Sequence, residues 1–267
     1  MSKISEQTRL DFEDTIKPYK SKITAILGKE KTVLNAIAGG AEDSAYKKIM
    51  LCEDMIYVSS LYMAQNSLSL KILEVKNNDA LNDARKVLYK AVIYLEELVT
   101  NFIDVSYSDL VKQYEAIENV PTAQRYYLVR KLGLAIGLLE VAFGDNSKWK
   151  WSFVELKGRF VVVAKNFVDM RRAAKAYFNP NDEEYEPTVL YIRMLGRLLE
   201  TSAAEYRDKY ELSTRRLDDM RSGIKFLLAR NKLYLAINDV KTAEESKKKA
   251  VVWKNKMDAD QKTGSSR

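Results

Sequence analysis

The side chains in this sequence that could do chemistry are carboxylates and amines, because the 267 residues include no histidine. Nucleophilic systems of the Ser-His-Asp and Cys-His types are therefore excluded, as are zinc sites with imidazole ligands. One cysteine, Cys52, cannot form a thiolate cluster or an intramolecular disulfide. Di-metal carboxylate bundles need Glu-x-x-His motifs, and the sequence has no glycine-rich phosphate loop. These absences favour binding over catalysis.

Two adjacent acidic pairs, Glu53-Asp54 and Glu96-Glu97, are the candidates for acid–base chemistry. Neighbouring residues on a helix point about 100° apart, so neither pair converges on one point. The acidic residues in 182–186 lack the alternating oxygen ligands and central glycine of a calcium loop. We therefore predict no enzyme, no metal site and no cofactor. An enzyme or ligand binder remains an alternative, with a carboxylate or lysine site in a deep pocket of the bundle.

Basic residues beside aromatic ones are better candidates, and they suit binding. A lysine-rich segment near the C-terminus surrounds Trp253, which predicts either a contact with an anionic surface or a helix docked by its tryptophan. We favour the docked tryptophan. A second group combines two tryptophans at an expected helix start with downstream basic residues. The candidate interaction residues are Trp149, Trp151, Arg171, Arg172, Lys175, Lys247, Lys248, Lys249, Trp253 and Lys254.

The elements that carry these residues are predicted to be helices. Glycine and proline break helices and supply the turns of β-rich folds, and the sequence has only 10 glycines and 4 prolines. Hydrophobic residues make up 46% of the chain, enough for a core. The predicted fold is all-α, a multi-helix bundle of long antiparallel helical hairpins. A short helical-repeat solenoid is the alternative.

The clearest helical pattern follows the turn at residues 77–78. Its apolar positions alternate steps of three and four: Leu81, Ala84, Leu88, Ala91, Leu95, Leu98 and Phe102. A second long helix over 42–76 should pack against it as an antiparallel hairpin. We expect about eight helices, with a break at Pro18 and one helix over 148–178.

The predicted domain organisation has four parts. Residues 1–178 form the main bundle, 179–187 an acidic loop flanked by prolines, and 188–258 C-terminal helices that pack on the bundle as one continuous domain. Residues 259–267 are expected to be a flexible tail.

The predicted function is that of a non-catalytic scaffold or adaptor with a protein partner. The formal net charge of +7 also permits nucleic acid or anionic lipid as the partner of the lysine-rich segment. Homo-oligomerisation is left open. The first residues lack the apolar core of a signal peptide, and the longest strongly apolar stretch, 160–164, is too short to span a bilayer. We expect a soluble, cytoplasmic protein.

Overall fold

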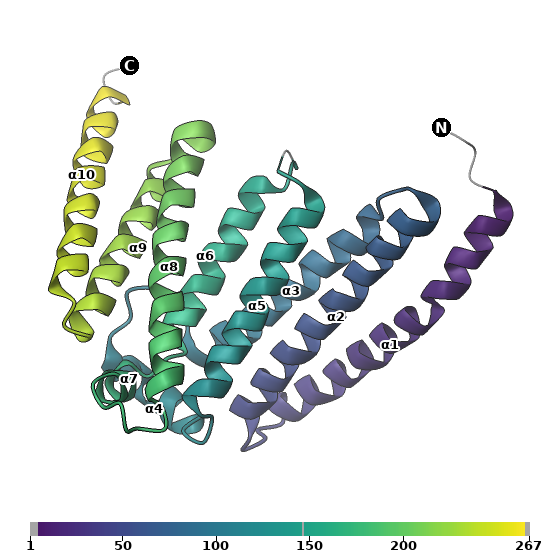
Figure 1. Ribbon diagram of the computed structural model, residues 1–267, viewed down its shortest axis with the longest axis horizontal. Helices are drawn as coiled ribbons and strands as arrows, with labels where there is room; N and C mark the ends of the chain where they lie inside the picture. The colour runs from purple at the N-terminus through teal and green to yellow at the C-terminus, as the bar shows by residue number, and fades with distance from the viewer. Residues whose placement is uncertain (1–4, 146, 265–267) are drawn as a thin grey trace. The chain divides into compact units, whose positions relative to one another are not determined.

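The computed structural model describes residues 5–145 and 147–264, and within them the chain forms ten α-helices and no strand. The predicted all-α helical bundle is confirmed (Figure 1). The helices are α1 (Glu6–Ala38), α2 (Ser44–Leu73), α3 (Asn78–Val99), α4 (Tyr107–Ala116), α5 (Thr122–Phe143), α6 (Lys150–Asn166), α7 (Met170–Tyr177), α8 (Tyr185–Lys209), α9 (Leu217–Ala236) and α10 (Val240–Gly264).

Two compact units divide the chain. The first contains residues 1–98 and 130–147, and the second contains 99–129 and 148–267. The residues of α5 are therefore shared, with those up to Val129 in the second unit. The acidic segment 179–187, predicted as the part between the main bundle and the C-terminal helices, lies inside the second unit.

In the first unit, α1 is one continuous helix that packs against α2 (Figure 1). The predicted break at Pro18 is therefore wrong. Proline removes one backbone N–H, which leaves the carbonyl four residues earlier without its helical partner. Pro18 lies on the exposed side of α1, as does Asp14. Water can therefore satisfy the carbonyl of Asp14, and the inward residues Phe12 and Ile16 remain buried.

The hairpin of α2 and α3 is antiparallel, as predicted. At one end Lys48 of α2 forms a 3.3 Å ion pair with Glu97 of α3. At the other end the Asn77 N–H donates to Asn66 Oδ1 over 2.9 Å. The Asn77 side chain also accepts a hydrogen bond from the Ala80 N–H (3.0 Å) and so caps α3.

The apolar stripe of α3 is buried from Leu81 to Leu98, as its spacing predicts. Phe102, the last member of the predicted stripe, is 69% exposed. The reason is that α3 ends at Val99 and the next residue, Thr100, has a positive φ of 124°. Beyond Val99 the chain is no longer helical, so a spacing of three or four residues no longer places side chains on the buried face.

In the second unit, the single helix predicted over 148–178 is two helices. Asp169 has an extended backbone, and its carboxylate accepts hydrogen bonds from the Arg171 N–H (3.0 Å) and the Arg172 N–H (3.2 Å). An aspartate in this role begins a new helix. The chain therefore turns between α6 and α7, and the apolar residues of both helices conceal the break in the sequence pattern.

The segment between α7 and α8 is shorter than the acidic loop predicted over 179–187. α8 begins at Tyr185, so Pro187 lies in its first turn, where the missing N–H costs nothing. Glu184 forms a two-pronged ion pair with Arg172, with nitrogen–oxygen distances of 2.6 and 2.7 Å. The segment therefore links α7 to the start of α8.

The C-terminal part of the second unit is formed by α8, α9 and α10. α9 packs against both of the others (Figure 1). A five-residue π-helical turn, Tyr210–Thr214, ends α8. α10 continues through Gly264, so most of the predicted tail over 259–267 is helical, and residues 265–267 lie outside the described residues. No helix in the described part of the chain is long and apolar enough to cross a membrane.

Candidate interaction surface

The two faces of α10 differ in what they contact. The inward face repeats at helical spacing and is buried: Ala243, Ser246, Ala250, Trp253 and Met257. Small residues near the start of this face allow α10 to approach α9 closely. The outward face carries the lysines that the sequence singled out.

Trp253 is 4% exposed and therefore holds α10 in place rather than meeting a ligand. A Cβ on Gly223 of α9 would lie 3.2 Å from the Trp253 ring and 3.0 Å from the carbonyl oxygen of Ala203. Only glycine gives the ring this space. The Arg207 guanidinium lies 5.3 Å from the ring centre and the Lys249 ammonium 5.4 Å from it.

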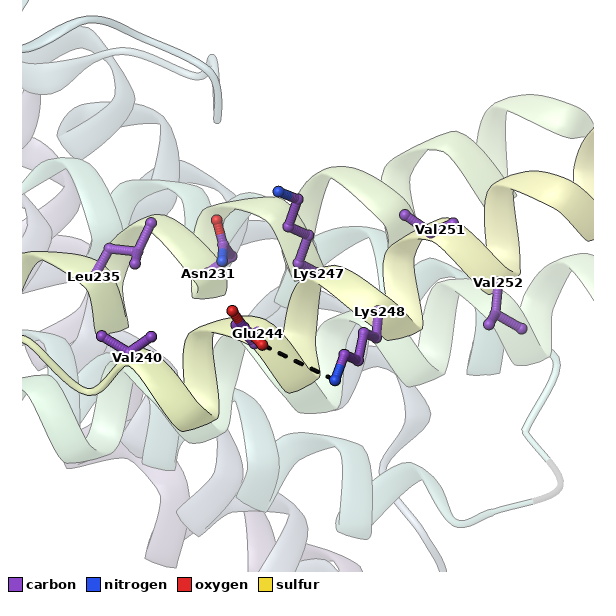
Figure 2. A pocket seen from close by; sticks show the side chains of 8 residues that line it. All are labelled: Asn231, Leu235, Val240, Glu244, Lys247, Lys248, Val251 and Val252. Atoms are coloured by element: carbon purple, nitrogen blue, oxygen red, sulfur yellow. Dashed lines mark ion pairs between the residues drawn. The ribbon is translucent and has the colours of Figure 1, made fainter.

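A groove of about 570 Å³ runs along the outer side of the hairpin of α9 and α10 (Figure 2). Apolar side chains dominate it: Leu235 comes from α9, and Val240, Val251 and Val252 come from α10. Each of the four is at least half exposed. The other lining residues are Asn231, Glu244, Lys247 and Lys248.

The turn between α9 and α10 positions this groove. Asn238 adopts a left-handed conformation with φ of 59° and ends α9. Asp239 then caps α10, because its carboxylate accepts a hydrogen bond from the Thr242 N–H over 3.1 Å. Hydrogen bonding from Thr242 lowers the pKa of Asp239. The Asn231 side chain donates to the Ala243 carbonyl (2.8 Å) and joins the two helices at the groove.

The charged residues of the groove are mixed in sign. Lys248 and Glu244 form a long ion pair of 3.9 Å on the α10 side, drawn as a dashed line in Figure 2. Lys247 and Lys254 are exposed. Lys249 lies at the edge of the buried face, where its ammonium is 3.9 Å from Glu200 of α8. Of the predicted lysines, Lys247 and Lys248 line the groove and Lys249 supports the packing of Trp253.

The second predicted group is not brought together by the structure. Trp149 and Trp151 stand half-buried at the start of α6. Arg171, Arg172 and Lys175 lie on α7, beyond the other end of α6. A 17-residue helix is about 25 Å long, and the eight residues of α7 are too few to span that distance back.

The basic residues of α7 serve separate contacts. The Arg171 guanidinium lies 4.0 Å from the centre of the Tyr107 ring. Arg172 pairs with Glu184 and also donates to the Glu118 carbonyl over 3.3 Å. Lys175 is exposed. These contacts hold α7 against its neighbours in the second unit, so they do not form a surface with the two tryptophans.

Reactive groups in the described residues are few. No group of three or more acidic or cysteine side chains there could hold a metal ion. Cys52 is a free, fully buried thiol, and burial raises its pKa. A thiol of this kind is inert near neutral pH.

Sequence reasoning missed the apolar half of the groove. Val240 and Val251 are separated by three helical turns on α10, and Leu235 of α9 lies beside Val240 (Figure 2). The sequence signal was weak, because charged residues occupy the helical turns between Val240 and Val251 and no continuous apolar stripe marks the groove. The lysines around Val251 and Val252 drew attention to charge instead.

The chain is thus an all-α helical protein whose C-terminal hairpin presents an open apolar groove. A model of the TP0443 family matches residues 8–261, so the chain belongs to the TP0443 family. The comparisons with curated proteins and with solved structures gave no match. The family name describes no activity.

Proposed function

We propose that the protein is a non-catalytic scaffold that binds an amphipathic helix of a partner protein in the groove between α9 and α10. The observation that carries the proposal is the exposure of the groove's four apolar side chains: Leu235 52%, Val240 50%, Val251 50% and Val252 63%. Leu235 and Val240 lie at one end of the groove and Val251 and Val252 at the other, with the polar and charged lining residues between them (Figure 2). Single exposed apolar residues are ordinary, but two exposed apolar pairs that line one groove are typical of a binding site. Burial of this set would stabilise a complex through the hydrophobic effect.

The shape and charge of the groove indicate what fits it. From Val240 to Val252 the lining of α10 spans about 18 Å, the length of roughly three helical turns. A partner helix would present apolar side chains every three or four residues toward it. Lys247 and Lys248 outnumber Glu244 at the rim, so acidic residues beside the apolar stripe of the partner would complement it.

The sequence supports a reducing location for this scaffold. The chain has one cysteine, Cys52, and it is a free buried thiol. Free thiols of this kind are usual in the cytoplasm, where we propose that the protein works.

The test is affinity purification from the native source, with bound proteins quantified by mass spectrometry. Val252→Glu puts a charge into the groove at an exposed position and should leave the unfolding temperature unchanged. The matched control is Asn255→Glu, which adds the same charge to an exposed position of α10 outside the groove. We expect a partner that the wild type and the control retain and that Val252→Glu loses at least about tenfold. A peptide of the partner's helix should then bind the purified chain.

Other occupants give different results in the same experiment. Self-association of the pure chain that Val252→Glu removes would replace the partner with a second copy. Binding to phosphatidylserine vesicles or RNA that falls steeply with salt, is lost in a Lys247→Glu, Lys248→Glu double variant and survives Val252→Glu would assign α10 to an anionic surface. Equal recovery of every bound protein by Val252→Glu and Asn255→Glu would overturn the proposal.

A further inference from the structure

A second, smaller pocket of about 120 Å³ lies further along α9, within the second unit, and shares Asn231 with the groove. Its walls come from the segment before α4, from α6 and from α9. Three of its residues are lysines: Lys165 on α6, and Lys225 and Lys232 on α9. We call it the lysine pocket.

The charges in the lysine pocket do not balance. Asp104 is its only lining carboxylate, so three ammonium groups against one carboxylate leave an excess of two positive charges. Asp104 forms a 2.7 Å ion pair with Lys232. The hydrogen bond from Lys232 lowers the pKa of Asp104 most, and the charges of Lys232, Lys165 and Lys225 lower it further. All three lysines therefore lie close enough to act on one carboxylate.

Lys165 is bonded to a carbonyl group and not to a carboxylate. Its ammonium donates to the carbonyl oxygen of Ile103 over 2.9 Å, and a carbonyl carries no compensating charge. Burial, followed by repulsion from Lys232, lowers the pKa of Lys165 to about 8, while attraction by Asp104 opposes this. A bound anion would offset the effects of burial and of Lys232 on the pKa of Lys165, because a negative charge nearby favours the charged form of the amine.

We propose that the lysine pocket binds a small tetrahedral oxyanion, of the phosphate or sulfate type, through Lys165, Lys225 and Lys232. The excess of two charges matches a doubly charged anion. A volume of about 120 Å³ corresponds to about four water molecules, enough for one such group and too little for a nucleotide. The anion replaces solvent against Lys165 and accepts hydrogen bonds from the three ammonium groups. The lysine pocket and the groove share Asn231, but none of the three lysines that would hold the anion lines the groove.

The test is isothermal titration of the full chain with sodium sulfate at pH 7 in a chloride buffer. We expect saturable binding of about one sulfate per chain. Lys165→Gln keeps a donor for the Ile103 carbonyl but removes the charge, so affinity should fall by about tenfold or more. Lys225→Gln changes an exposed side chain and should weaken binding in the same direction. The matched control, Lys254→Gln on the exposed side of α10, should bind as the wild type does.

A pH series separates this site from a general charge effect. Sulfate keeps its charge between pH 7 and pH 9, whereas a lysine with a pKa of about 8 loses its proton there. The wild-type affinity should therefore fall about five- to tenfold over that range. Lys165→Gln should show no such fall, since the titrating group is gone.

Three results would overturn the proposal. The first is no saturable binding of sulfate by the wild type at millimolar concentration. The second is equal weakening by Lys225→Gln and Lys254→Gln. The third is a wild-type affinity that stays constant between pH 7 and pH 9. Circular dichroism checks the fold of each variant, and if Lys165→Gln unfolds, Lys225→Gln and the wild-type pH series still decide.

Discussion

Lys209 and Lys165 are two enclosed amines of the second unit with opposite surroundings. Lys209, at the end of α8, lies 2.7 Å from Glu155 and 3.1 Å from Asp219. Burial would lower its pKa, but hydrogen bonds to these two carboxylates raise it above its ordinary value of 10.5. The ammonium of Lys165 instead donates to a carbonyl and faces other lysines, which leaves its pKa lowered. An amine between carboxylates stabilises the fold, whereas an amine among amines favours an external anion.

The largest expected effect separates the two lysines by stability. Lys209→Met leaves Asp219 buried without its counter-ion, and Asp219 is only 10% exposed at its side chain. Breaking a buried pair in this way costs about 3 kcal/mol of unfolding free energy. Urea denaturation at pH 7 measures the change. Lys165→Met removes a charge that has no bonded carboxylate. We therefore expect the unfolding free energy to fall much less than in Lys209→Met, or to rise.

The exposed pair of Lys86 and Asp83 gives the control for this measurement. Its members are 68% and 41% exposed, so Lys86→Met should leave the unfolding free energy nearly unchanged. A loss for Lys165→Met as large as that for Lys209→Met would contradict the comparison.

Local patterns in the sequence predicted the helices well and their ends less well. The spacing of apolar residues in α3 identified a buried stripe, because a helix keeps one face inward over its whole length. Pro18 and Asp169 show the limit. A proline on an exposed face is tolerated, and a capping aspartate between two helices that each carry an apolar face looks like one polar residue of a continuous helix. Both outcomes depend on which face meets the neighbouring helices, and the local sequence does not specify it.

The two surfaces that we propose could be predicted only in part. Lys247 and Lys248 were found because they adjoin each other in sequence, and they line the groove. Lys165 and Lys232 are 67 positions apart, and only the packing of α6 near α9 brings them to one pocket. A single sequence carries no record of such long-range proximity, so the lysine pocket could not be recognised before the fold.

The next effect is a difference in pH dependence. A lysine with a folded-state pKa below its unfolded value destabilises the fold while it is protonated. This cost is fully present below pH 8 and is relieved as the pH rises from about 8 toward 10.5. The unfolding free energy of the wild type should therefore rise relative to that of Lys165→Met by about 2 kcal/mol between pH 7 and pH 10. Urea denaturation of both proteins across this range measures it.

Lys209 should behave in the opposite way in the same series. A raised pKa makes a contribution that is fully present below 10.5 and lost only as the pH rises through the folded-state value. The difference between the wild type and Lys209→Met should therefore be constant from pH 7 to pH 10. If both differences were flat, the lowered pKa of Lys165 would be refuted.

The smallest effect concerns Asp104, the one carboxylate that the lysine pocket contains. Asp104 and Lys232 are 75% and 67% exposed, so Asp104→Asn should change the unfolding free energy by less than about 0.5 kcal/mol. Its loss should nevertheless change sulfate binding in two ways, because the carboxylate repels the anion and also raises the pKa of Lys165. At pH 6, where Lys165 stays protonated, affinity should rise by about two- to fivefold. The midpoint of the pH dependence of sulfate binding should move below that of the wild type.

The control is Asp218→Asn, at an exposed site paired with Arg221, which should change neither the affinity for sulfate nor this midpoint. If Asp104→Asn and Asp218→Asn bound sulfate with the same affinity and the same pH dependence, Asp104 would not face the bound anion.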